Sequence, residues 1–108
     1  MRAGKLRFRA DVEQYDGAVW QPFFSDWFDF RTASEGEDRR AFRAAGRWRM
    51  EWDQVSGLAT HSEGFRLVWR YGEKNGQPLV HYLLIDEVLD ADNRRREIEI
   101  TCHEVIEN

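Results

Sequence analysis

Hydrophobic and charged side chains alternate at the start of the chain. Between residues 5 and 13 every second position is apolar, and the positions between them are Lys, Arg, Asp or Glu. A period of two is typical of a β-strand that buries one face. The apolar members of this row are Leu6, Phe8, Ala10 and Val12. Asp16 and Gly17 come next and predict a tight hairpin, because both central positions of a type I′ turn need positive φ.

The segment that follows this turn, residues 20–31, reads "WQPFFSDWFDFR". Six of its twelve side chains are aromatic and two are carboxylates. We expect it to return as the second strand, and Pro22 restricts that strand to a sheet edge or a bulge, because proline cannot donate to the ladder. Such a run can line a ligand pocket, stack nucleic-acid bases or form a packing surface between two protein chains.

A helix is predicted over residues 35–45. Ser34 and Glu37 have the spacing of a capping box, in which each side chain accepts a hydrogen bond from the other residue's backbone amide. Acidic residues come first in this segment and basic residues later, as the helix dipole prefers. Gly46 is a natural stop. The apolar stripe of such a helix is narrow, formed by Ala41, Phe42 and Ala45.

The C-terminal half predicts a β-meander. Asn75 and Gly76 form the strongest hairpin signal in the chain, and placing them at a turn sets Trp69 opposite Tyr82. A second turn over residues 90–93 sets Ile85 opposite Ile98 and His81 opposite Cys102. The strand between the turns, residues 79–89, is apolar on both sides, so the meander must be covered on both faces or curl into a barrel. We therefore predict a mainly β protein, a small antiparallel β-barrel with one helix-bearing insertion loop.

Composition limits the function classes. One hundred and eight residues support one domain, residues 1–108, around one core. The net charge of −4 argues against a dedicated nucleic-acid binder, whose affinity would come from phosphate contacts. One cysteine rules out an internal disulfide and a multi-cysteine zinc site. Apolar stretches are far shorter than the ~20 residues of a membrane span, so we expect no membrane anchor and no export signal.

Catalytic chemistry has little support in this sequence. Cys102 and His103 are adjacent in a predicted strand and point to opposite faces, and His81 is read as a hydrogen-bonded neighbour of a small buried thiol. Asp26 and Asp29 also fall on opposite faces of a strand, so we read both as solvated carboxylates. His61 is read as a surface residue. Phosphate-loop, metalloprotease, serine-hydrolase and EF-hand motifs are all absent. We expect a protein that is not an enzyme, without metal or cofactor.

One stretch combines basic and aromatic side chains. It consists of Arg39, Arg40, Arg43, Arg47 and Arg49, interleaved with Phe42, Trp48 and Trp52. By itself this pattern fits a solvated helix face, a contact surface between subunits or a site of transient phosphate contact.

The order of features along the chain resembles a known family. The segments "MRAGKLRFR", "SEGEDRRAFRAAGR", "ATHSEGFRLVWRYG" and "IDEVLDADNRRREIEITCHEV" follow one another as in the small head-tail joining proteins of long-tailed bacteriophages and gene transfer agents. These are also called stopper or head-completion proteins. The likeness covers nearly the whole chain, and its most specific parts are the start at residues 4–7 and the strand, turn and strand that close on "CHEV".

This resemblance implies a structural virion protein with a β-barrel core and no cofactor. Such proteins form a homo-oligomeric ring, of six or twelve copies, below the portal and adaptor rings. The ring closes the DNA channel of a filled head and provides the docking surface for the tail. The implied partners are further copies of the chain, an adaptor or portal-side protein, a tail terminator or tail protein and, transiently, packaged DNA. The implied location is the virion, after assembly in the host cytoplasm.

The resemblance also indicates candidate residues. A segment between the second and third strands projects into the channel in this family, and it corresponds to about residues 32–55. The candidate gating residues are Ser34, Glu37, Arg39, Arg40, Arg43, Arg47 and Arg49. In the aromatic run we expect Phe23 and Trp27 to face the barrel interior. That leaves, as candidates for subunit or connector contact, Trp20, Phe24, Phe28, Phe30 and Phe42.

Two other function classes stay open at this stage. The chain could be a small acidic protein-binding module, such as an immunity or host-takeover protein, that uses the aromatic run. It could also be a β-barrel ligand binder or enzyme, if His81 and Cys102 faced a deep cavity. A filled barrel would argue against the second of these alternatives.

Overall fold

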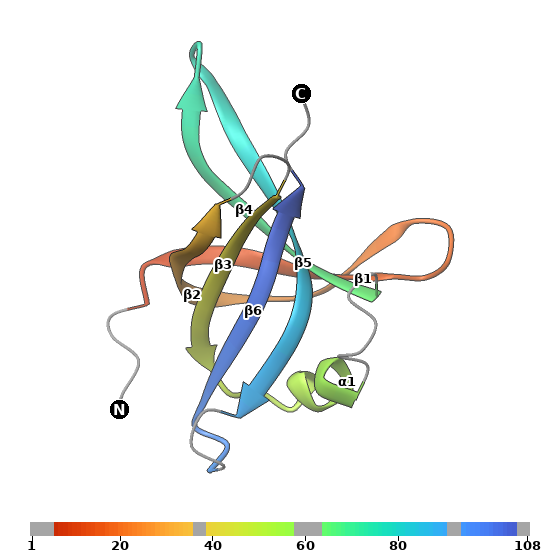
Figure 1. The fold of residues 1–108 in the computed structure, drawn as a ribbon. Helices are drawn as coiled ribbons and strands as arrows, with labels where there is room; N and C mark the ends of the chain where they lie inside the picture. Colours follow the sequence, from red (N-terminus) through yellow and green to blue (C-terminus); the bar gives the residue numbers. More distant parts are fainter. Residues whose placement is uncertain (1–5, 36–38, 58–63, 91–93, 106–108) are drawn as a thin grey trace.

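The computed structural model describes residues 6–35, 39–57, 64–90 and 94–105. Within them, the strands and the helix are β1 (Phe8–Tyr15), β2 (Trp20–Glu35), β3 (Arg39–Arg47), α1 (Glu51–Gly57), β4 (Phe65–Lys74), β5 (Gln77–Asp90) and β6 (Glu97–Val105). The strands form one closed antiparallel barrel in the order β1-β2-β3-β6-β5-β4 (Figure 1). The predicted fold class, a small antiparallel β-barrel, is confirmed.

The first strand follows the predicted alternation. Ala10 and Val12 are buried in the core, and β1 pairs with β2 on one side and with β4 on the other, which closes the barrel. The connection to β2 is a four-residue loop rather than the predicted two-residue turn, because Tyr15 pairs with Trp20. The Asp16 carboxylate accepts hydrogen bonds from the backbone amides of Ala18 and Val19, at 2.8 and 2.9 Å.

The prediction of a helix over residues 35–45 is wrong. Residues 39–47 form β3, which pairs with β2 along one edge and with β6 along the other. The buried positions of β3 are Phe42, Ala44 and Gly46, which have the spacing of a strand. This segment is rich in alanine and arginine, which favour a helix. The backbone hydrogen bonds that it forms with a strand on each side outweigh that propensity. The proposed capping partner Glu37 lies outside the described residues.

The helix of this protein lies after β3 instead. α1 begins with the acidic residues Glu51 and Asp53 in its first turn, which the helix dipole favours. Its apolar side chains Trp52 and Val55 are both 1% exposed and belong to the barrel core. The indole ring of Trp52 lies edge-on against Phe24, with 5.0 Å between the ring centres. α1 is thus fixed to the barrel by one large aromatic side chain.

The β4–β5 hairpin confirms the predicted turn but corrects the register. Asn75 and Gly76 have φ angles of 54° and 77°, as a type I′ turn requires. A bulge between Arg70 and Glu73 then shifts the pairing, so that Trp69 lies opposite His81 rather than Tyr82. Gly72, with a φ of 89°, is the residue in this bulge that needs the left-handed conformation.

The predicted β5–β6 register is also wrong. Ile85 pairs with Cys102, and Asp90 pairs with Ile98. The connection therefore spans residues 91–96 rather than four residues, and a second irregularity between Ile85 and Glu87 moves the register further. His81 consequently does not lie opposite Cys102. A turn motif predicts the residue pairing of a hairpin only as far as the first bulge. Each bulge inserts one extra residue on one strand and so shifts every pair beyond it.

Side chains fill the interior of the barrel. All six strands and α1 contribute to a single buried cluster, which includes Phe28, Leu67, Leu83 and Ile100. β3 approaches β2 closely where Gly46 meets the ring of Phe28, and a Cβ atom at position 46 would lie 2.9 Å from that ring. The filled interior argues against the ligand-binding barrel that the sequence left open.

Candidate assembly surfaces

Three of the five predicted contact residues lie inside the barrel. Phe28, Phe30 and Phe42 are 1%, 9% and 7% exposed. Trp27, expected in the interior, is 46% exposed. The expected facing of β2 is therefore wrong for Trp27, Phe28 and Phe30, whereas Phe23, also expected to face the interior, does pack against the core. Phe28, Phe30 and Phe42 are core residues. The sequence held the right signal, because the positions that alternate with Phe28 and Phe30 are polar apart from Trp27. They are Ser25, Trp27, Asp29 and Arg31.

The other two predicted contact residues, Trp20 and Phe24, are partly exposed. The guanidinium of Arg66 lies over the ring of Trp20 and also over the ring of Tyr82, at 4.4 Å from each ring centre. Arg66 therefore links β2 to β5 across the outer wall. Phe24 packs against the core and carries the guanidinium of Arg49 at 4.4 Å. Their role in contacts between chains remains a prediction.

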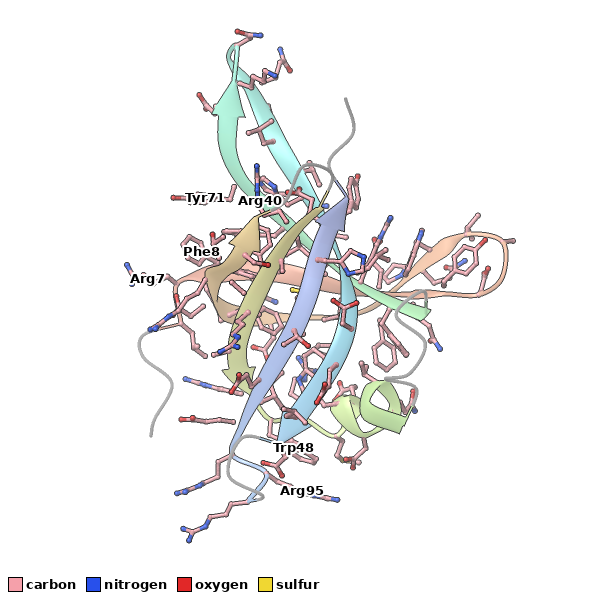
Figure 2. The ribbon with its side chains drawn as sticks, viewed as in Figure 1. Arg7, Phe8, Arg40, Trp48, Tyr71 and Arg95 are labelled. Atoms are coloured by element: carbon pink, nitrogen blue, oxygen red, sulfur yellow. The ribbon has the colours of Figure 1, made fainter. Side chains whose placement is uncertain are left out.

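Arginine side chains also cover other rings on the outside. Arg9 lies over Trp27 at 5.8 Å, and Arg95 lies over Trp48 at 5.1 Å, at the end of the barrel opposite the β4–β5 hairpin (Figure 2). A guanidinium over an aromatic face is attracted by the ring quadrupole and excludes water from it. Several rings of the outer wall are thus covered by arginines.

The predicted gating residues fall on fixed elements. Ser34 is near the end of β2, and Arg39, Arg40, Arg43 and Arg47 are all in β3. Because β3 is paired along both edges, these residues belong to the barrel wall and not to a projecting loop. Of the two remaining candidates, Glu37 lies outside the described residues, and Arg49 lies between β3 and α1.

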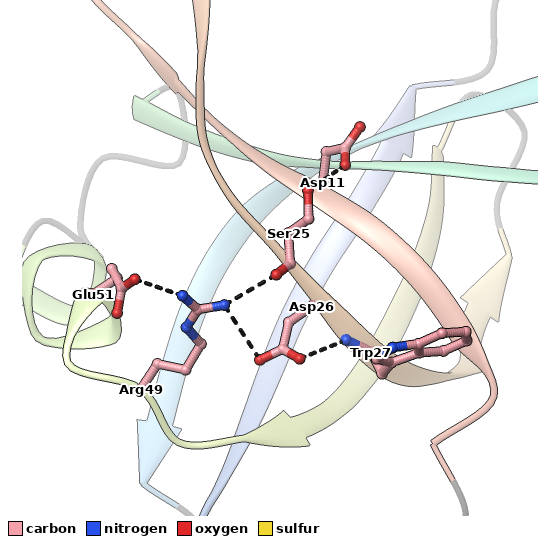
Figure 3. A network of polar contacts seen from close by, with 6 residues as sticks. All are labelled: Asp11, Ser25, Asp26, Trp27, Arg49 and Glu51. Atoms are coloured by element: carbon pink, nitrogen blue, oxygen red, sulfur yellow. Dashed lines mark hydrogen bonds and ion pairs between the residues drawn. The ribbon is translucent and has the colours of Figure 1, made fainter.

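Arg49 is the centre of a polar network (Figure 3). Its guanidinium donates to the Ser25 carbonyl at 3.0 Å and to the Glu51 carboxylate at 2.7 Å, and it lies 3.6 Å from the carboxylate of Asp26. The pKa of Glu51 is lowered, first by a hydrogen bond from its own backbone amide and then by Arg49. Asp26 in turn accepts from the backbone amide of Trp27 at 2.8 Å. Arg49 therefore ties the start of α1 to β2, which is a structural role.

A second network lies on the outer face of β1. Asp11 accepts a hydrogen bond from the Ser25 hydroxyl and another from Arg70, the latter at 2.9 Å. These two bonds lower the pKa of the Asp11 carboxyl. Next to it, Arg66 donates to Glu13 at 2.8 Å. Two ion pairs thus join β1 to β4, and the hydrogen bond from Ser25 joins β1 to β2.

His81 lies at the base of the β4–β5 hairpin. Its Nδ1 is 2.8 Å from the Glu104 carboxylate, and its Nε2 is 3.1 Å from the Tyr71 carbonyl. Both partners are acceptors, and a neutral imidazole can donate to only one of them. Arg40 lies 3.5 Å from the other oxygen of Glu104. These contacts join β3, β4, β5 and β6 at one end of the barrel.

Cys102 is a buried thiol rather than a reactive one. It is 1% exposed, and burial, followed by the nearby charge of Asp86, raises its pKa to about 12. His103 points to the opposite side of β6, where its Nδ1 lies 2.9 Å from the Asp86 carboxylate. Among the described residues, no cluster of His, Cys, Asp and Glu could hold a metal ion. His61 lies outside the described residues.

The β4–β5 hairpin extends beyond the body of the barrel (Figure 1). Its outer part is exposed on both strands, including Tyr71 and Val80 at 53% and 38%. At its base, Tyr71 stacks on the buried ring of Trp69 with 4.9 Å between ring centres. Within the described part of the chain, no helix has the length and apolar character that crossing a membrane requires.

Comparisons with known proteins identify a shared fold. No family model and no curated protein matches this sequence. Among solved structures, a chain in the virion of a native gene transfer agent particle is similar, with a TM-score of 0.59 and 13% sequence identity. The alignment covers 96% of this chain and 98% of that chain. The two chains therefore share their fold from end to end.

Proposed function

We propose that this chain is a structural protein of the head-tail connector in a phage-like particle. The observation that carries the proposal is the end-to-end similarity of the barrel to a chain of a gene transfer agent virion. The order of sequence segments, which resembles that of head-tail joining proteins, supports it independently. In this role the chain forms a ring below the portal and adaptor, closes the DNA channel and offers a docking surface to the tail.

The properties of the barrel suit such a role. Its interior is filled by side chains, so its contacts with other molecules are made by the outer wall, the hairpins and α1. The net charge of −4 gives a ring of copies a repulsive field toward DNA, so that DNA passes without being held firmly. Local arginines allow transient phosphate contacts only. Copies of the chain, an adaptor protein and a tail protein are its proposed partners.

In this proposal, β3 acts as a fixed wall and not as a moving gate. Moving β3 would break its backbone hydrogen bonds with β2 and with β6 at once. Each unpaired buried backbone group costs about 1–3 kcal/mol, so displacing a nine-residue strand would unfold the barrel. Channel closure in this proposal therefore comes from the packing of rigid barrels around the axis.

The test is the phenotype of particles that lack this chain. We expect electron microscopy to show heads that have lost their DNA, together with free tails, and nuclease treatment to degrade the released DNA. Supplying the wild-type chain in trans should restore tailed, filled particles. Heads that still carry tails in its absence would exclude a head-tail joining role.

The alternative of a small acidic binding module loses its main support. That reading placed the aromatic run of β2 on the surface, but Phe28 and Phe30 are core residues. A stable one-to-one complex with a soluble partner, found without incorporation of the chain into particles, would favour the binding module over the connector.

A further inference from the structure

Few strand contacts join the β4–β5 hairpin to the barrel at its base. In the described residues, β4 pairs with β1 only as far as Trp69, and β5 pairs with β6 only from Leu84 onward. Beyond these two positions the two strands pair only with each other, and the hairpin extends from the barrel (Figure 1). Side-chain contacts at the base therefore help to fix the orientation of the hairpin.

His81 makes contacts on both sides of this base. Its Nδ1 atom lies 2.8 Å from the carboxylate of Glu104 on β6, and its Nε2 atom lies 3.1 Å from the backbone carbonyl of Tyr71 on β4. Tyr71 and Gly72 are in the bulge of β4 and have no opposite residue in the described pairing of β4 with β5. One imidazole ring thus links the bulge of the hairpin to the body of the barrel.

The protonation state of this ring decides how many of its two contacts are hydrogen bonds. Both partners are acceptors, so only the charged imidazolium donates to both. A neutral ring keeps one N–H, and it keeps the one on Nδ1, because a hydrogen bond to a carboxylate is stronger than one to a neutral carbonyl. The unprotonated Nε2 then faces the Tyr71 oxygen, so that two lone pairs replace the hydrogen bond at 3.1 Å.

Charged groups act on the ring from β6 and from β3. Glu104 stabilises the charged imidazolium. Arg40 lies 3.5 Å from the other oxygen of the same carboxylate, so it competes for Glu104 and repels the imidazolium. The side chains of His81 and Glu104 are 18% and 17% exposed, so water screens their attraction only in part.

β4 and β5 present aromatic rings near His81. From β4, the ring of Trp69 lies 5.4 Å away, measured between ring centres. On β5 itself, the adjacent Tyr82 is exposed on the outer wall, where the guanidinium of Arg66 covers its ring. The carboxylate on β6 and the guanidinium on β3 are therefore the groups whose removal should change the protonation of His81 most.

We propose that His81 is a pH-sensitive latch at the base of the β4–β5 hairpin. The charged ring holds the bulge at Tyr71 to Glu104, and loss of the Nε2 proton releases the bulge while the contact with β6 stays. Histidine changes its charge between about pH 5 and pH 8, so the latch is closed at the lower end of this range and open at the upper end. The hairpin, with its exposed Tyr71 and Val80, then changes orientation more readily. This device does not depend on the connector role.

An NMR titration of the full chain between about pH 5 and pH 8 tests the latch. Long-range nitrogen–proton spectra report which ring nitrogens of His81 carry a proton, and we expect both at the lower end and Nδ1 alone at the upper end. The amide of Gly72, whose nitrogen is bonded to the Tyr71 carbonyl carbon, should shift with the same midpoint. Hydrogen exchange of residues 80–83, corrected for the intrinsic effect of pH, should become about three- to tenfold faster as the ring loses its proton.

Substitutions at the ring and at its charged partners separate the latch from a general effect of pH. His81→Gln should remove the pH response of Gly72. Glu104→Gln should move the midpoint to lower pH and Arg40→Gln should move it to higher pH, because the first removes an attractive charge and the second a repulsive one. His103→Gln, which changes the other described histidine on the opposite side of β6, is the matched control and should leave the Gly72 response unchanged.

Each of three results would overturn the proposal. A neutral ring that carries its proton on Nε2 would keep the hydrogen bond to Tyr71 and leave the latch closed. A Gly72 response that survives His81→Gln would assign it to another titrating group. Titration of the ring without a change at Gly72 or in hydrogen exchange would show that water replaces the lost bond and that the hairpin stays in place.

Discussion

Aromatic rings occupy two settings in this barrel, and the settings differ in what covers each ring. In the interior, rings cover one another: Phe30 stacks on Trp69 with 4.2 Å between ring centres, and Phe28 lies edge-on to Trp52. On the outer wall, arginines cover the rings, as Arg66 covers both Trp20 and Tyr82. Aromatic residues therefore pack against one another in the inward row of a strand and bind arginine side chains in the outward row.

Aromatic content alone does not show which rings of a strand face outward. Adjacent residues of one strand, Trp27 and Phe28, belong to different settings, because side chains alternate across a sheet. The interior also tolerates polar atoms poorly. In the described residues, the indole nitrogens of Trp52 and Trp69 are buried without a hydrogen-bond partner. Each costs about 1–3 kcal/mol, which the ring contacts around it must offset.

The largest expected effect separates the two neighbours on β2. Phe28→Ala removes a ring that is fully enclosed by the core, so we expect a loss of about 3–5 kcal/mol in the free energy of unfolding. Trp27→Ala should cost less than about 1 kcal/mol, because nearly half of that side chain faces water. Denaturant unfolding measures both. Equal losses would mean that the two rows of β2 are not distinct.

Gly46→Ala probes how tightly β3 is packed on the interior rings. The added methyl would lie 2.9 Å from the ring of Phe28, so we expect a loss of about 1–3 kcal/mol from overpacking. Gly64→Ala is the control, since a Cβ at position 64 meets no atom within 4 Å. Combining Gly46→Ala with Phe28→Leu should cost less than the sum of the single changes. Additive costs would show that position 46 and the ring do not touch.

Arg66→Lys tests the outer setting, because it keeps the charge and removes the planar group that stacks on two rings. We expect a loss of about 0.5–1 kcal/mol in the free energy of unfolding, and increased exposure of Trp20, visible in fluorescence. Lys74→Ala, a change of an exposed cation without a ring beneath it, should be neutral. If Arg66→Lys is equally neutral, the ion pair with Glu13 and not ring stacking is what holds this side chain.

At neutral pH the smallest effect is that of Cys102 ionisation, which influences stability only at alkaline pH. Its pKa is raised in the folded chain to about 12, from a reference value of 9.0. Folding thus favours the neutral thiol, so its contribution is fully present below pH 9 and is lost as the pH rises toward 12. Relative to Cys102→Ala, the wild-type chain should lose stability by up to about 1.4 kcal/mol per pH unit above pH 9, whereas near pH 7 the difference in stability between the two chains should not change with pH. Parallel stability curves for the two chains above pH 9 would mean that burial does not control this thiol.

The sequence predicted the barrel because several local signals agreed. The alternation in residues 5–13, the turn at Asn75 and Gly76 and the doubly apolar strand after it left few arrangements other than a closed antiparallel sheet. The resemblance to head-tail joining proteins led to the same class of fold. The resemblance also indicated candidate gating residues in residues 39–47. The local sequence pattern predicted a helix for this segment, which is the strand β3 in the structure.

Bulges explain most of what could not be predicted. Register shifts interrupt four of the strand pairings, for example between Arg70 and Glu73 and between Ile85 and Glu87. Each shift changes which residues lie opposite one another, and a bulge depends on how strongly a strand must bend to close the barrel. Local sequence carries little information about that bend, so His81 was assigned the wrong partner.

The sequence by itself determined which segments are amphipathic and where the Asn75–Gly76 hairpin turns. Its length also indicated a single hydrophobic core. Only the tertiary structure decided that residues 39–47 form a wall strand, because partners on β2 and β6, distant in sequence, override a local helical pattern. It also decided which row of β2 faces inward and which rings of the outer wall are covered by arginines. Those properties depend on closure of the sheet, since closure assigns each strand its neighbours and each side chain its side.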